Sequence, residues 1–337
     1  MFYFSAMAIE KIINEWKKKV FKPVYWLEGE EEYYIDKLVD YAEHKILSES
    51  EASFNLTVFY GRDANWADIT NACKRYPMFS DTQVVIIKEA QHLKEIDKLE
   101  AYIQQPLHST VLVVAYKDKK LDSRTKFAKL IKQKAEVFTT KKMYDSALPE
   151  WVNRLVNGLG YTITPKANAL LVEHIGNDLS RIENEIEKML INVGSRKSIT
   201  EEDIEQFVGI SKEYNIFELQ SALAGKDLVK AMKIVQYFAA NPKVAPMQLV
   251  LPSLYSFFSK VYMIYGISGG EDDIARQAGV SPYFVKDYVK ASKVYGFAGT
   301  EKILLLLHQY NLKSIGVNAA RADDGELLKE MVVKAVM

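Results

Sequence analysis

Cysteine and net charge are scarce in this 337-residue sequence, and each absence excludes a class of protein. The single cysteine, Cys73, rules out an intramolecular disulfide framework and a cysteine-rich metal site. The 44 lysines and arginines balance 44 aspartates and glutamates, so no overall field draws the chain to nucleic acid or to acidic membranes. Any affinity for DNA must therefore come from local patches.

Unbroken apolar runs are missing as well. Residues 1–10 lack the basic segment and the long apolar segment of a secretory signal. The most apolar later stretch, residues 247–265, contains Pro252, Lys260 and several serines, whereas a helix that spans a bilayer needs about 20 largely apolar residues. We expect a buried helix there and a cytoplasmic protein.

The sequence also lacks a phosphate-binding loop. Such a loop follows the pattern G-x-x-x-x-G-K-[ST], because its backbone N–H groups cradle the phosphates and its lysine neutralises them. The first expected strand leads instead into residues 27–32, LEGEEE, with four glutamates where an anion would bind. Residues 225–227, GKD, are predicted to form a turn at the end of a helix.

Other catalytic patterns are absent too. The five histidines have no H-x-x-x-H spacing, and no G-x-S-x-G nucleophile motif occurs. Glu89 follows a strand that resembles the position where ATPases carry an acidic pair, but it stands alone beside a lysine and is predicted to form a surface ion pair. We expect no catalytic residue, no metal site and no cofactor.

Strands and helices alternate over residues 1–142. Strands are predicted at 24–27, 55–60, 84–88, 110–116 and 137–139, and helices at 31–47, 66–75, 92–104 and 123–134, the last starting at Asp122 or Ser123. Continuous apolar strands are typical of a parallel sheet that is covered on both faces. The alternation therefore predicts a doubly wound α/β domain with right-handed crossovers.

The pattern after residue 142 predicts helices only. Shorter helices occupy residues 143–212, and longer ones follow from residue 213. The predicted fold class is α/β plus all-α. Its three domains are an α/β domain at 1–142, a small helical domain at 143–212 and a helical C-terminal domain at 213–337.

An apolar loop precedes the strand at 84–88. Residues 75–81, RYPMFSD, place two large apolar side chains, Met78 and Phe79, at the mouth of that buried strand. The chain otherwise resembles an ATPase that has lost its catalytic parts. An ATPase-like order of elements with an apolar tip suggests a protein that grips another protein.

Two regions carry signals for nucleic-acid binding. Residues 117–142 hold ten Lys or Arg against three Asp or Glu, and several lie on the predicted helix at 123–134. They could contact phosphates or an acidic partner, or only solvent. Residues 274–285 have the spacing of a helix-turn-helix corner at Ala275, Gly279 and Val285. The second helix, however, has few base-reading side chains, so a plain helical hairpin is favoured.

Several segments, in their order and spacing, resemble the delta subunit family of the bacterial DNA polymerase III clamp loader, which belongs to the AAA+ superfamily. Residues 24–31, VYWLEGEE, resemble its opening strand and degenerate phosphate loop, and residues 77–87 resemble its clamp-contacting tip and next strand. Residues 121–127, 176–188 and 215–222 resemble its D-x-R-x-K, lid and collar motifs.

This resemblance implies an AAA+-like parallel-sheet domain, a helical lid and a helical collar through which subunits join. It implies a subunit in DNA replication that does not hydrolyse ATP and that binds and opens the sliding clamp, beta. The implied partners are the ATPase subunits gamma or tau, a delta-prime subunit and primer–template DNA. The chain would thus be part of a DNA-directed DNA polymerase, a nucleotidyltransferase, with no catalytic site of its own.

The resemblance also assigns roles to individual residues. Met78 and Phe79 match the apolar pair that enters the clamp's pocket, with Tyr76 and Pro77 beside them. Methionine stands at position 78 where leucine is common in the family, and its flexible side chain can fill such a pocket.

Contacts with DNA or another partner are expected at Arg124, Lys126 and Lys129. Two rival functions stay open: a helix-turn-helix DNA-binding regulator that uses residues 272–295, and an active nucleotide-dependent enzyme.

Overall fold

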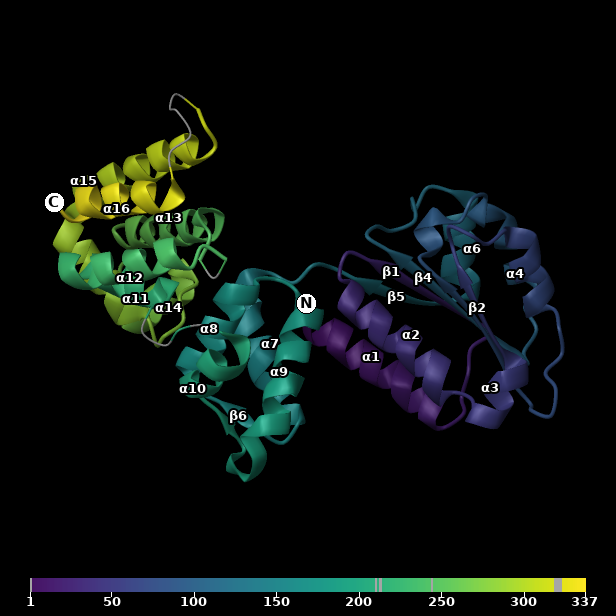
Figure 1. The fold of residues 1–337 in the computed structure, drawn as a ribbon. Coiled ribbons are helices and arrows are strands. Elements are labelled where there is room, and N and C mark those ends of the chain that lie inside the picture. The colour runs from purple at the N-terminus through teal and green to yellow at the C-terminus, as the bar shows by residue number, and fades with distance from the viewer. Residues whose placement is uncertain (1, 210, 212–213, 244, 318–322) are drawn as a thin grey trace. The chain divides into compact units, whose positions relative to one another are not determined.

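The computed structural model describes residues 2–209, 211, 214–243, 245–317 and 323–337 (Figure 1). The chain divides into two compact units, Met1–Met143 and Tyr144–Met337. Within the described ranges, no helix is long and apolar enough to cross a membrane.

The first unit is built on a five-stranded parallel sheet with the strand order β2-β3-β4-β1-β5. The central strands are buried almost throughout, as their continuous apolar sequences predict, whereas the two edge strands are partly exposed. The strands are β1 (Val24–Gly29), β2 (Leu56–Tyr60), β3 (Gln83–Lys88), β4 (Thr110–Lys117) and β5 (Glu136–Thr140).

Helices cover both faces of this sheet (Figure 1). Trp26 of β1 packs against Phe127 of α6 with the ring centroids 5.6 Å apart, which anchors one layer. Trp16 of α1 packs edge-on against Tyr25, 5.0 Å away, on the other face. The helices are α1 (Phe2–Lys17), α2 (Glu32–Lys45), α3 (Glu49–Asn55), α4 (Trp66–Cys73), α5 (Glu100–Gln104) and α6 (Lys126–Lys134).

Several details of this unit differ from the sequence predictions. Helices α1 and α3 were not predicted, and Asn55, expected to begin the strand at 55–60, ends α3. The helix expected at 92–104 is broken into two 3-10 turns, Ala90–His92 and Ile96–Leu99, before α5. Helix α6 begins later than expected, because Thr125 rather than Asp122 or Ser123 caps it and accepts a 3.1 Å hydrogen bond from the Ala128 N–H.

The second unit is mainly helical, but the prediction of helices alone was wrong. Two strands of two residues each, β6 (Thr162–Ile163) and β7 (Ser198–Ile199), pair in parallel. They are too short for alternation to reveal them. The elements beside them are α7 (Leu148–Gly158), α8 (Pro165–Ile175), α9 (Leu179–Val193) and α10 (Glu201–Asp203), with 3-10 turns at Asp145–Ala147 and Gly194–Arg196 and a π turn at Ile204–Val208.

Longer helices complete the second unit around a core in which Phe257 packs 4.4 Å from Tyr288. The helix Val285–Ser314 is kinked at Gly296, whose φ of 64° falls in the left-handed region. The elements are α11 (Ile216–Ala224), α12 (Leu228–Ala240), α13 (Met247–Ile264), α14 (Glu271–Ala278), α15 (Val285–Ser314) and α16 (Asp324–Val336).

Several motif residues of this unit mark the ends of helices. Gly176 follows α8 with a φ of 71°. Asp178 caps α9 by accepting from the Arg181 N–H at 2.9 Å, and Asn215 caps α11 by accepting from the Glu218 N–H at 3.0 Å. The predicted boundary between residues 212 and 213 lies outside the described residues, so the division of the helical part into two domains stays a prediction.

Candidate functional site

The apolar loop lies between α4 and β3, beside the end of α3 (Figure 1). We call Tyr76, Pro77, Met78 and Phe79 the tip. Phe79 is 90% exposed, Tyr76 77% and Met78 55%, while Pro77 is half-buried. Exposure of three large apolar side chains in one short loop is typical of a surface that docks against another protein.

The base of the loop is held by buried polar side chains. The Gln83 side-chain nitrogen lies 3.3 Å from the carbonyl oxygens of Ala72 and Cys73 at the end of α4. Thr110 of β4 donates a 2.9 Å hydrogen bond to the same Cys73 carbonyl. These bonds satisfy carbonyls that a helix end leaves without partners. The loop therefore leaves α4 from a fixed point.

The middle of the loop is held by α3. Asn55 accepts a hydrogen bond from the Met78 N–H at 2.7 Å and donates one to the Met78 carbonyl at 2.8 Å. Glu51 accepts a 2.9 Å bond from the Ser80 hydroxyl. Hydrogen bonds from Ser48, and then from Ser80, lower the pKa of Glu51 to about 2, so its carboxylate is ionised at neutral pH.

Phe79 has a strained backbone. Its φ is 56°, in the left-handed region, which costs a residue other than glycine about 1–2 kcal/mol. Its exposed side chain buries little area within the chain that could offset this cost. Strain at an exposed aromatic residue points to a binding role, because packing of the fold does not require it.

Phe54 was missed by the sequence reasoning. It is 64% exposed, and its ring meets that of Phe79 edge-on with the centroids 6.3 Å apart. The available signal was a single large apolar side chain in the otherwise polar helix 49–55, ESEASFN. Phe54 lies beside Phe79 because of the fold, and the spacing of the two residues in the sequence does not predict this contact.

The opposite edge of the sheet holds residues 27–32, the segment whose sequence lacks the pattern of a phosphate loop. Because β1, β3 and β4 run parallel, the end of β1 lies at the edge away from the tip, which precedes β3. At that end, the buried Glu28 carboxylate accepts hydrogen bonds from the Trp26 ring N–H at 3.0 Å and the Leu121 N–H at 3.1 Å. The Glu28 carboxylate is thus hydrogen-bonded to donors within the protein itself.

Glu31 is a second buried carboxylate just after the end of β1. Its buried carboxylate lies 3.4 Å from the Met143 backbone nitrogen and 3.9 Å from the Lys142 ammonium. Burial raises the pKa of Glu31, partly opposed by Lys142. A Cβ on Gly29 would lie only 2.2 Å from the Thr140 carbonyl oxygen. Two buried carboxylates and tight packing thus occupy the end of β1.

Glu89 forms a surface ion pair, as its position predicted. Its carboxylate lies 3.6 Å from the Arg62 side chain, while the neighbouring Lys88 pairs with Glu43 at 2.6 Å. Among the described residues, no group of three or more His, Cys, Asp or Glu side chains is arranged to hold a metal ion.

The basic candidates also lie away from the tip. Arg124 is exposed and forms a forked ion pair with Asp122, with distances of 2.9 Å and 2.7 Å. Lys126 and Lys129 are exposed on the first turns of α6. This segment follows the end of β4, at the edge of the sheet opposite the tip. The structure therefore does not bring the two sets of candidate residues together.

The segment that resembles a helix-turn-helix packs into the helical unit. Val285 and Tyr288, on the would-be recognition helix, are buried. Phe284 stacks on Phe217 of α11 with the ring centroids 4.7 Å apart. A large part of this helix's apolar surface thus serves the core.

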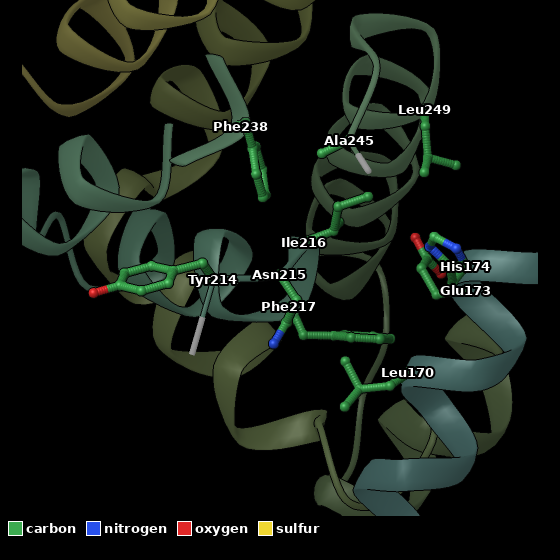
Figure 2. A pocket seen from close by; sticks show the side chains of 10 residues that line it. All are labelled: Leu170, Glu173, His174, Tyr214, Asn215, Ile216, Phe217, Phe238, Ala245 and Leu249. Carbon is green, nitrogen blue, oxygen red and sulfur yellow. The ribbon is translucent and has the colours of Figure 1, made fainter. Parts of the chain in front are cut away.

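The described part of the helical unit contains a small and a larger cavity. The smaller, of about 30 Å³, is lined mainly by apolar side chains together with Glu173 and His174 (Figure 2). It is large enough only for a water molecule or two. Burial lowers the pKa of His174, and Glu173 accepts a hydrogen bond from Ser253. The larger, of about 490 Å³, lies between α13 and α15 and is lined mainly by apolar side chains.

Comparison with known proteins links this arrangement to one family. Residues 25–141 match the family model described as DNA polymerase III, delta subunit. The DNA polymerase III subunit delta of Bacillus subtilis is 25% identical over 324 residues, covering 93% of this chain and 92% of the relative. The probable DNA polymerase III subunit delta of Aquifex aeolicus is 21% identical over 309 residues, covering 84% of this chain and 86% of the relative.

A solved structure supports the fold along nearly the whole length. The Bacillus subtilis DNA clamp loader delta protein YqeN has a TM-score of 0.55 and 24% identity, covering 97% of this chain and 99% of that one. At that identity the likeness speaks for the fold. The family model and the two sequence relatives agree: the chain is similar to DNA polymerase III delta subunits, through residues 25–141 in the family model and along most of its length in the two relatives.

Proposed function

We propose that this chain is a clamp-loader subunit that binds a sliding clamp through the tip and opens the ring without hydrolysing ATP itself. The observation that carries the proposal is Phe79, an exposed aromatic residue that keeps a strained left-handed backbone at the end of a firmly held loop. The likeness to delta subunits agrees with this function, since the similar Bacillus subtilis structure is a clamp loader delta protein.

The tip has enough apolar surface to anchor a complex. Full burial of a side chain such as Phe79 or Met78 in a partner's apolar pocket contributes roughly 1.5–3 kcal/mol each. A few desolvated anchors commonly dominate an interface. Phe54, beside Phe79, adds an aromatic wall to the same surface.

Opening of the ring follows from a difference in affinity. A bound protein shifts an equilibrium only by the difference between its affinities for the two states. The tip would therefore bind an open clamp more tightly than a closed one. Neighbouring ATPase subunits would supply the nucleotide step, since the phosphate position of this chain is filled by Glu28 and Glu31.

The remaining parts fit a role in a larger complex. We assign residues 143–212 to a lid and residues 213–337 to a collar that joins gamma or tau and delta-prime subunits. Arg124, Lys126 and Lys129 lie at the edge of the sheet away from the tip. They are therefore proposed to face primer–template DNA or another subunit and not the clamp.

The decisive experiment is a titration of the purified chain with the sliding clamp of the same organism, in the absence of ATP. The double variant Met78→Ala with Phe79→Ala is expected to lose more than 100-fold in affinity, because two anchors are removed. Its melting temperature should match that of the unsubstituted chain, since both side chains are exposed.

A matched control is Ile191→Ala, which removes another exposed apolar side chain, 82% accessible, from the helical unit. It should leave the affinity unchanged. Equal affinity of the double variant and the unsubstituted chain would refute the proposed function.

A further inference from the structure

We propose that α3 is a brace that holds the tip in its binding conformation, with Asn55 as the positioning residue. The proposal rests on the proposed function and assigns to α3 a role in it. The brace is defined as Asn55 and Glu51, which lie one turn apart on α3 and each bond a residue of the loop.

Asn55 binds the backbone of Met78 as a neighbouring strand would. Its Oδ1 accepts from the Met78 N–H at 2.7 Å, and its Nδ2 donates to the Met78 carbonyl at 2.8 Å. Both polar groups of one loop residue are thereby satisfied by a single side chain. The side chain is itself buried, 3% exposed, and makes a third bond of 3.1 Å to the Glu51 carbonyl. An amide with three hydrogen bonds has little freedom to rotate.

Glu51 supplies the second attachment. Its Oε1 accepts from the Ser80 hydroxyl, while its Oε2 accepts from the Ser48 N–H at 3.0 Å and hydroxyl at 2.7 Å. The carboxylate is therefore oriented from within α3 before it meets the loop. These hydrogen bonds join α3, its cap residue Ser48 and the loop.

The two attachments flank Phe79. Met78 is bonded to Asn55 on one side of it, and Ser80 to Glu51 on the other. Phe79 itself is exposed and has a φ of 56°, so packing of its own side chain cannot fix this backbone. The fixed neighbours hold it instead. The hydrogen bonds of the brace thus stabilise a loop conformation that the loop alone would not favour.

A braced loop binds more tightly than a free one. A segment that must become ordered on binding loses affinity by the fraction of time that it spends in other conformations. Removal of the Asn55 amide takes two hydrogen bonds from Met78. We expect the tip to sample other conformations and the clamp affinity to fall by about tenfold.

Two variants of the full-length chain test the brace. Asn55→Ala removes the positioning amide, and Ser80→Ala removes the second attachment from the less buried side, where loss of the fold is not a concern. The matched control is Asn241→Ala, which deletes a similar amide-to-carbonyl bond, of 2.9 Å, to Tyr237 in α12.

Two readouts separate positioning from general stability. The first is hydrogen exchange of the peptide that covers residues 74–82 in the free chain, expected to quicken about tenfold in Asn55→Ala and less in Ser80→Ala. The second is affinity for the sliding clamp, expected to fall in the same order. The control variant should change neither.

The outcomes also separate this inference from the proposed function. If Phe79→Ala binds the clamp as well as the unsubstituted chain does, the proposed function fails. If Phe79→Ala weakens binding, the brace is overturned by either of two results. One is unchanged exchange in both brace variants; the other is faster exchange with unchanged affinity.

Discussion

The two edges of the central sheet have become opposites in chemistry. At the edge before β3, the tip exposes large apolar side chains, and buried polar groups serve only to hold the loop. At the other edge, after β1, the buried carboxylates of Glu28 and Glu31 and a tightly packed glycine occupy the end of the strand. The comparison teaches that one parallel sheet can carry a closely packed, carboxylate-rich end at one edge and an exposed apolar loop at the other.

The largest effect on stability is expected at Gly29, where the close packing leaves no room for a side chain. Gly29→Ala would place a Cβ 2.2 Å from the Thr140 carbonyl oxygen, at a φ of 134° that side chains rarely adopt. Overpacking against backbone and an unfavourable φ together should lower the free energy of unfolding by about 3 kcal/mol. Chemical denaturation of the full chain measures it.

A second glycine separates the two causes. Gly160 has a φ of 82° with open space around it, so Gly160→Ala carries only the backbone penalty of about 1 kcal/mol. Similar losses in the two variants would mean that close packing at the end of β1 is unimportant.

The tip should behave in the opposite way, because there a smaller residue relieves strain. Phe79→Gly and Phe79→Ala both remove the ring, and only glycine adopts a φ of 56° freely. We expect both variants to lose clamp binding, and the glycine variant to unfold with a free energy about 1 kcal/mol higher than the alanine variant. Paired denaturation curves decide this, and equal stabilities would show that Phe79 is not strained.

The titration of Glu31 gives a smaller and pH-dependent effect. Burial raises the pKa of this carboxyl above its usual 4.5, so the folded chain binds the proton more tightly than the unfolded chain does. Its contribution to stability is therefore greatest at low pH and falls as the pH rises from 4.5 through the raised folded pKa.

Glu31→Gln removes this titration and keeps an acceptor for the Met143 N–H. The stability of the glutamine variant relative to the unsubstituted chain should rise across that pH window and then level off. Melting temperatures of both proteins from pH 4.5 to 8 measure the difference. A difference that does not change with pH would contradict the raised pKa.

The sequence was informative where burial leaves a continuous pattern. The apolar runs at 84–88 and 110–116 predicted the central strands, and the exposed loop before β3 followed from its position. Helices α1 and α3 were overlooked, and β6 and β7 were too short to show a period. Helix α6 starts at Lys126, later than predicted, because Thr125 and not Asp122 caps its first turn.

The chemistry of the site was harder to predict than its position. Asn55 and Met78 are 23 residues apart, and nothing in their spacing indicates that one side chain will bond the other's backbone. The same holds for Phe54 beside Phe79 and for Glu28 beside the Leu121 N–H. These contacts arise because parallel strands bring loops that are distant in sequence to one edge of the sheet.

The smallest expected effect tests whether the two edges act separately. The triple variant Arg124→Ala, Lys126→Ala and Lys129→Ala removes three exposed cations from the edge opposite the tip. Isolated surface charges contribute little to stability, and charges more than about 10 Å from an interface are largely screened at 0.1 M salt. Clamp affinity at that salt should therefore stay within about twofold of the unsubstituted chain. If these residues meet DNA, retention on primer–template by the assembled loader should weaken and lose part of its salt dependence. A large loss of clamp affinity in this variant would mean that the clamp also contacts the basic edge, and the separation of the two edges would not hold.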